Sequence, residues 1–139
     1  MFRIKISKAD KLFSLFIRHR DRWTCQRCHQ TYPEKSASLH CSHYWSRGNK
    51  SVRFDPENAA AMCFGCHQIL GSNPEDHRLI FLKRLGQQKY DALTIRAKTP
   101  QKVDEKSICL GLTLQLQEMG VLRDKNAPRI VYRPTPGMT

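Results

Sequence analysis

The stretch that decides the fold is residues 39–70, "LHCSHYWSRGNKSVRFDPENAAAMCFGCHQIL". Its first part, "LHCSHYW", begins with alternating apolar and polar residues and has few helix formers, which predicts a strand that enters a hairpin. The basic loop "SRGNKS" follows, "VRF" at 52–54 is the predicted return strand, and "DPEN" is a turn. A short helix is expected to begin within "CFGCHQIL". The segment therefore predicts two antiparallel strands followed by a helix.

Four of the six cysteines form two CxxC pairs, Cys25 with Cys28 and Cys63 with Cys66. Two such turns can present four thiolates to one ion, and a site filled by four sulfur ligands leaves no position for water. We therefore expect a structural Zn²⁺ that clips the start of the domain to residue 66. The alternative, four reduced buried cysteines, leaves the paired spacing unexplained. The two remaining cysteines are expected to be small buried apolar residues: Cys41 and Cys109.

The chain of 139 residues carries a formal net charge of +12, concentrated in its first part. Residues 1–53 hold 12 lysines and arginines against 3 acids, whereas residues 54–139 hold 12 against 9. A basic excess around the hairpin predicts a nucleic-acid partner, with a mere solubility charge as the alternative. No apolar run is long enough for a transmembrane helix, and the start does not read as a secretory signal. A cytoplasmic location is therefore expected.

Helices are predicted on both sides of the hairpin. Ser7 is a candidate N-cap for a helix over 8–20, and "SNPEDHRLIFLKRLG" at 72–86 has a proline in its first turn and a closing glycine. "QQKYDALTIRAK" at 87–98 and the stretch 99–120 predict two more helices, and an extended tail follows. We expect an α+β protein with a basic N-terminal helix over 1–22, a zinc-containing core over 23–98, and a C-terminal helix and tail over 99–139.

Three polar residues in the segment have the chemistry of phosphodiester hydrolysis. His43 ends the first predicted strand, Asn58 follows the return strand, and His67 lies just after the last zinc cysteine. A hairpin that closes on the helix would bring the two histidines to one cleft. A neutral imidazole can take a proton from the attacking water, and a divalent cation can neutralise the phosphate and the leaving oxygen. The asparagine can hold the loop or the base in orientation.

The order "SHY…PEN…CFGCH" resembles the HNH (ββα-metal) nuclease motif in its four-cysteine zinc branch. The wording "SHYWSRGNKSVRFDPENAAAMCFGC" is similar to the NinG/Rap recombination endonucleases of lambdoid phages, over roughly residues 22–97. The resemblance implies a divalent-metal-dependent DNA endonuclease in a phage context. Its substrate would be branched or recombination-intermediate DNA, and Mg²⁺ or Mn²⁺ would be the catalytic ion.

Carried over by residue, His43 matches the general base, Asn58 the orienting asparagine, and His67 the position that binds the catalytic metal. Many relatives have an acidic residue just before the base, but this chain has Ser42, a weak ligand for a divalent ion. His40 could supply the second ligand or could be a structural strand histidine. Three basic residues bracket the hairpin loop and are candidates for DNA phosphate contacts, with a solvated loop as the alternative: Arg47, Lys50 and Arg53.

The main rival is a non-catalytic zinc-knuckle module that binds DNA or RNA through its basic face. The zinc pairs and the charge fit both readings, and only His43, Asn58 and His67 discriminate between them. A phage protein-interaction scaffold is the third possibility, which salt-insensitive binding would favour. A homodimer would suit paired nicks across a DNA junction, although no sequence feature demonstrates one.

Overall fold

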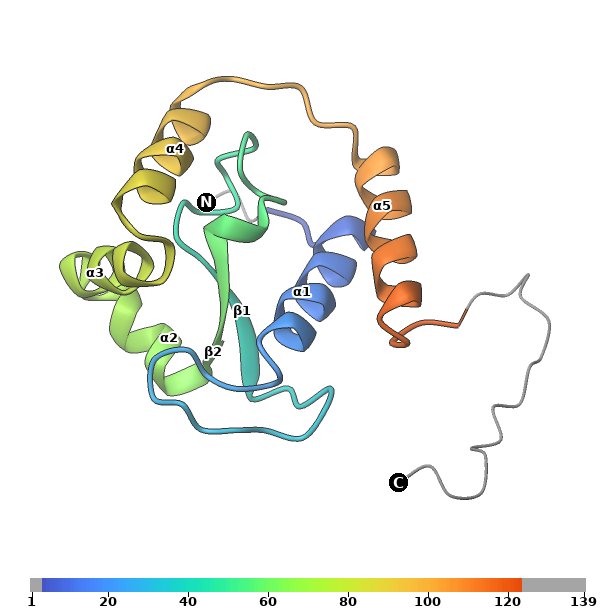
Figure 1. Ribbon diagram of the computed structural model, residues 1–139, viewed down its shortest axis with the longest axis horizontal. Helices are drawn as coiled ribbons and strands as arrows, with labels where there is room; N and C mark the ends of the chain where they lie inside the picture. Colours follow the sequence, from blue (N-terminus) through green and yellow to red (C-terminus); the bar gives the residue numbers. More distant parts are fainter. Residues whose placement is uncertain (1–3, 124–139) are drawn as a thin grey trace, which may run out of the picture.

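A two-stranded antiparallel hairpin lies at the centre of the protein, in a computed structural model that describes residues 4–123 (Figure 1). Strand β1 (Leu39–His43) pairs with β2 (Ala59–Cys63), and the register sets Leu39 opposite Cys63 and His43 opposite Ala59. Helix α2 (Phe64–Gly71) begins directly after β2. The predicted order of two strands followed by a helix is therefore present, and the fold is α+β.

The predicted return strand was misplaced. Residues 52–54 lie in a turn, and a short 3₁₀ helix (Pro56–Asn58) separates them from the true second strand. Val52 is fully buried against Leu93 and Ala97 instead of pairing with β1. The alanines of β2 are poor strand formers in isolation, but their small side chains let elements pack closely on both faces of the hairpin. Tertiary packing outweighs local propensity here.

Helix α1 (Lys8–Arg20) covers one face of the hairpin, and α5 (Glu105–Glu118) packs against α1, as Figure 1 shows. The prediction of a helix over 8–20 is confirmed, because Ser7 and Asp10 form a reciprocal capping box at its start. Phe13 and Ile17 of α1 share a buried cluster with β2 and α5. The first and last described helices thus contribute to one core, while the proposed division into three units stays a prediction.

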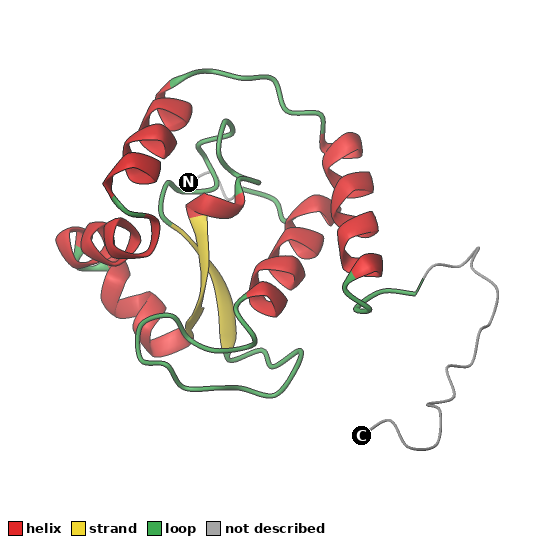
Figure 2. Cartoon of the chain, viewed as in Figure 1, coloured by secondary structure: helices red, strands yellow, loops and turns green. Residues whose placement is uncertain are grey.

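Helices α2, α3 (Pro74–Leu85) and α4 (Gln87–Lys98) lie on the other side of the hairpin (Figure 2). The predicted helices at 72–86 and 87–98 are confirmed, and so is the one in 99–120. Gly86 joins α3 to α4 with φ of 81°, a conformation that favours glycine. Phe81 of α3 anchors this side in the main buried cluster. The predicted tail, residues 124–139, lies outside the described residues.

Candidate metal centres and active site

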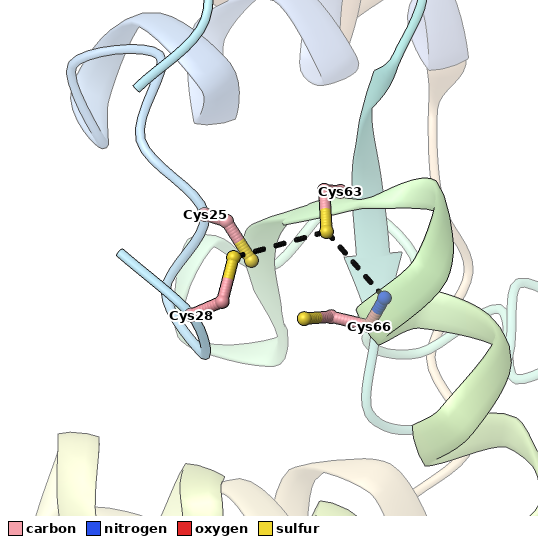
Figure 3. Close-up of side chains that lie close together, drawn as sticks. All are labelled: Cys25, Cys28, Cys63 and Cys66. Carbon is pink, nitrogen blue, oxygen red and sulfur yellow. Dashed lines mark hydrogen bonds between the residues drawn. The ribbon is translucent and has the colours of Figure 1, made fainter. Parts of the chain in front are cut away.

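The four cysteines of the CxxC pairs come together, as Figure 3 shows. Cys25 and Cys28 belong to the loop after α1, whereas Cys63 ends β2 and Cys66 lies in the first turn of α2. Their four sulfur atoms all lie within 4.8 Å of one another. A backbone hydrogen bond of 2.9 Å from Gln26 N to the Ala61 carbonyl fixes the loop to β2. The predicted four-cysteine cluster is confirmed, in a geometry suited to holding a zinc ion.

The electrostatics of this cluster favour a cation. Burial raises the pKa of the Cys66 thiol to about 12. Burial alone would also raise the pKa of Cys25. Hydrogen bonds from the backbone of Cys28, Cys63 and Arg27 outweigh this effect and lower the pKa of Cys25 to about 7. Four thiolates this close would repel one another, so some of the cysteines stay protonated without a cation. Binding of Zn²⁺ requires thiolates and therefore releases these protons. All four candidate ligands are sulfur, the donor set that is typical of structural zinc sites. Cys41 lies apart from it and packs beside the α1 cluster.

His43 ends β1 with one ring nitrogen already occupied. Its Nε2 lies 2.9 Å from the carbonyl oxygen of Arg53, which can only accept a hydrogen bond. In the neutral ring Nε2 therefore carries the proton, and Nδ1 keeps its lone pair. Burial of the ring, which lies 5.6 Å from the Phe13 ring, lowers the pKa of His43 below its usual 6.5. The imidazole is thus neutral near pH 7, as a general base requires.

Asn58 is fully buried and holds the loop that follows His43. Its Oδ1 accepts a hydrogen bond of 2.8 Å from Trp45 N. Its Nδ2 donates to the carbonyls of Trp45, at 2.9 Å, and Val52, at 3.0 Å. The asparagine therefore ties the two ends of the loop together. Of the two roles expected for it, the contacts fit the holding of the loop, through which it acts on His43 indirectly.

His40 and His67 approach each other on the opposite face of β1 from His43. Residues three apart in a strand point to opposite faces, and the rings of His40 and His67 lie 5.7 Å apart between centroids. The Nδ1 of His67 is buried and has no hydrogen-bond partner among the described residues. Burial, together with the charge of His40, lowers the pKa of His67. His67 therefore offers a free ring nitrogen, whereas the Nε2 of His40 lies 3.1 Å from the Ala37 carbonyl and is already engaged.

A basic cleft of about 420 Å³ follows the free edge of β1, between this strand and α1. His40 and His43 leave β1 on opposite faces, yet both border the cleft, because the cleft runs along the edge between those faces. Its cationic lining comes from Lys11, Arg18 and Arg47. The sequence predicted one cleft for His43 and His67, but His67 does not line this cleft, because it lies on the opposite face of β1 from His43. Lys11 was not among the predicted site residues. The signal was present in the spacing, because residues 11 and 18 of a helix lie on one face.

The three basic loop residues proposed for DNA contact have different surroundings. Arg47 borders the cleft. Arg47 also lies 3.6 Å from Asp10, with 31% of its side chain exposed, whereas Arg53 pairs with Asp10 more closely and keeps only 12% of its side chain exposed. Lys50 is exposed and lies at a second hollow, away from His43. Only Arg47 is therefore placed beside both His43 and the open cleft.

Comparison with known proteins adds the family. The family model described as "NinG: Bacteriophage Lambda NinG protein" matches residues 3–111, which is most of the chain. No curated protein matches the chain, and no solved structure does. None of the helices within residues 4–123 has the length and apolar character needed to cross a membrane.

Proposed function

This chain belongs to the NinG family, and we propose that it is a divalent-metal-dependent endonuclease that hydrolyses DNA phosphodiester bonds. Its substrates would be branched or recombination-intermediate DNA, formed in the cytoplasm of a bacterial host during phage growth. The observation that carries the proposal is the state of His43. A neutral histidine with a free Nδ1 borders a cleft lined by cationic side chains.

His43 acts as the general base. Its Nδ1 takes a proton from a water molecule whose oxygen attacks the phosphorus, and the bond from phosphorus to the 3′ oxygen breaks. The hydrogen bond from Nε2 to the Arg53 carbonyl fixes the ring and stabilises the imidazolium that forms. Lys11, Arg18 and Arg47 bind the phosphates that flank the reacting one, which explains why the charge gathers in this part of the chain.

Asn58 and Asp10 are positioning residues in this proposal. Asn58 fixes the loop that begins immediately after His43. Asp10 binds the guanidinium of Arg53, whose carbonyl accepts the hydrogen bond from His43. Both act through the backbone around the base, and neither side chain donates to or accepts from its ring.

His67 would hold the catalytic ion, with His40 as the candidate second ligand. Mg²⁺ or Mn²⁺ bound there would neutralise charge on the phosphate and on the leaving oxygen. The cysteine-bound Zn²⁺ has a separate role, since it fixes the start of α2 and therefore the position of His67.

The proposal is tested with zinc-loaded protein and end-labelled linear, nicked, forked and four-way DNA, each with Mg²⁺ or Mn²⁺. Cleavage that requires the added ion is expected, with the branched substrates cut fastest. If no substrate is cut with either ion, the nuclease proposal fails.

The rival function, a zinc module that binds nucleic acid without cutting it, is favoured by the same net charge of +12. It predicts binding that weakens steeply with salt, no cleavage of any substrate, and no effect of His43→Ala on affinity. Sedimentation of the same complexes would show whether the protein binds a junction as a dimer.

A further inference from the structure

A second basic region lies where the loop after β1 meets the connection between α4 and α5 (Figure 1). Three hydrogen bonds join these two segments. Asn49 Nδ2 donates to the Ala97 carbonyl, at 2.9 Å. Ser51 Oγ donates to the Thr99 carbonyl, at 2.8 Å, and accepts from Gln101 N, at 3.2 Å. These bonds fix the two segments against each other, so the hollows between them are a built feature of the fold.

The same bonds place three lysines along the hollows. Lys50 lies between Asn49 and Ser51 in the sequence, and Lys98 lies between the two residues whose carbonyls accept their hydrogen bonds. Lys50 and Lys98 accordingly line one hollow of about 360 Å³ together. Lys102 lines the adjoining hollow of about 520 Å³, which Lys50 also borders. Lys50, Lys98 and Lys102 are all exposed and are called the lysine row below.

The carboxylates at these hollows are already engaged. Asp55 pairs with Arg96, at 2.7 Å. Asp104 is the N-cap of α5, and Glu105 accepts a hydrogen bond of 2.8 Å from the Ser7 hydroxyl. Within residues 4–123, no member of the lysine row forms an ion pair. Like charges gathered in one place repel each other, so the row favours a bound anion.

A polar wall separates the lysine row from the cleft at His43. Asp10 borders the cleft, whereas Arg53 and Glu105 border the larger hollow of the row. Arg53 Nε donates to Asp10, at 3.0 Å, and closes the wall between them. Ser7 joins the same residues, because its backbone N–H donates to Asp10 and its hydroxyl donates to Glu105. The cleft and the lysine row are therefore two separate basic surfaces of one chain.

We propose that the lysine row binds the phosphate backbone of a second DNA arm, while the cleft at His43 holds the arm that is cut. The proposal rests on the nuclease function proposed above and deepens it, because it locates what would distinguish a branched substrate from a linear one. A row that spans adjoining hollows suits the successive phosphates of a strand, and lysine contacts phosphate without reading bases. A short linear duplex can occupy only one of the two surfaces at a time, whereas a four-way junction can occupy both.

The test measures binding by zinc-loaded protein without Mg²⁺ or Mn²⁺, so that the result does not depend on cleavage. The probes are a fluorescent four-way junction and a linear duplex as long as one junction arm. The triple variant Lys50→Gln/Lys98→Gln/Lys102→Gln should bind the junction at least about tenfold more weakly. It should bind the duplex less than about twofold more weakly, because the cleft still holds a single arm. The slope of log K against log salt for the junction should fall by about two to three, as expected when three phosphate contacts are lost.

A matched control removes the same charge elsewhere. The variant Lys35→Gln/Lys83→Gln/Lys89→Gln replaces three exposed lysines that do not line the hollows of the row. It should weaken junction binding less than about threefold. Equal losses in the two triple variants would overturn the proposal, because net charge alone would then explain the binding. Equal losses for junction and duplex in the first variant would also overturn it, because the row and the cleft would then hold the same arm.

Chemical acetylation of the wild-type protein gives a second readout that needs no variant. With the junction bound, the three lysines of the row should be acetylated at least about fivefold more slowly than in free protein, while Lys83 and Lys89 should react at the free rate. Unchanged acetylation of the row would refute the assignment. A protected row without cleavage of any substrate would support the second-arm site and overturn the nuclease proposal. Cleavage with an unprotected row would do the reverse.

Discussion

Replacing Asn58 by alanine should destabilise the protein strongly, because this side chain satisfies three backbone groups. It accepts a hydrogen bond from Trp45 N and donates to the carbonyls of Trp45 and Val52, and it is fully buried. An unsatisfied buried group costs about 1–3 kcal/mol, and carbonyls lie toward the low end of that range. The three together give a loss of about 3–5 kcal/mol in the free energy of unfolding. For a small domain this is a large part of the total.

The assay is chemical denaturation of the zinc-loaded protein, followed by circular dichroism. Asn73→Ala is the matched control, because Asn73 is exposed and donates one side-chain hydrogen bond, of 2.7 Å, to the Ile69 carbonyl. That variant should lose less than about 1 kcal/mol. Asn58→Asp should be no better than alanine, since a carboxylate cannot donate to the two carbonyls.

A local measurement separates loop release from global instability. Amide hydrogen exchange at Trp45 should accelerate more in Asn58→Ala than exchange at Leu116 of α5, a helix that packs mainly against α1. The reasoning is refuted if Asn58→Ala lies within about 1 kcal/mol of wild type, or if exchange at Trp45 is unchanged.

Three further outcomes are expected. Chelating the zinc, or replacing Cys63 by serine, should lower the helical circular dichroism, and an unchanged spectrum would show that the cluster does not fix α2. Asp10→Ala should lower the free energy of unfolding by about 3 kcal/mol, because it leaves the largely buried Arg53 guanidinium without its carboxylate and breaks the capping box. A loss under about 1 kcal/mol would contradict this reasoning. The cleavage rate should be flat near pH 7 and fall below pH 6.5, because burial lowers the pKa of His43 and only the neutral ring is a base; a midpoint above pH 7 would exclude this assignment.

The helices could be predicted from the sequence because their ends are set by local chemistry. Ser7 and Asp10 cap α1, Pro74 begins α3, and Gly86 ends it, and each signal lies within a few residues of the boundary that it fixes. The second strand could not be placed in the same way. Its alanines carry no strand signal, and its position depends on α1 and α2 packing against both faces of the hairpin.

The same contrast between local signals and long-range packing applies to the candidate sites. CxxC spacing is local, so the cysteine cluster could be predicted from it. The pairing of Arg53 with Asp10 joins residues far apart in the sequence, and nothing near Arg53 indicated that its charge was already used. The packing of His77 against Tyr44 and Phe81 is likewise non-local for Tyr44, because it arises only when α3 packs beside the end of β1.

The nuclease proposal depends most directly on His43. The decisive measurement is single-turnover cleavage of an end-labelled four-way junction with Mn²⁺, by wild-type protein and by His43→Ala at equal zinc content and equal circular dichroism. A general base contributes about 10²–10⁴-fold, so the variant should bind the junction normally and cleave it at least about 100-fold more slowly. If the wild type leaves the junction intact, or if His43→Ala cuts it at the wild-type rate, His43 is not the base of a nuclease.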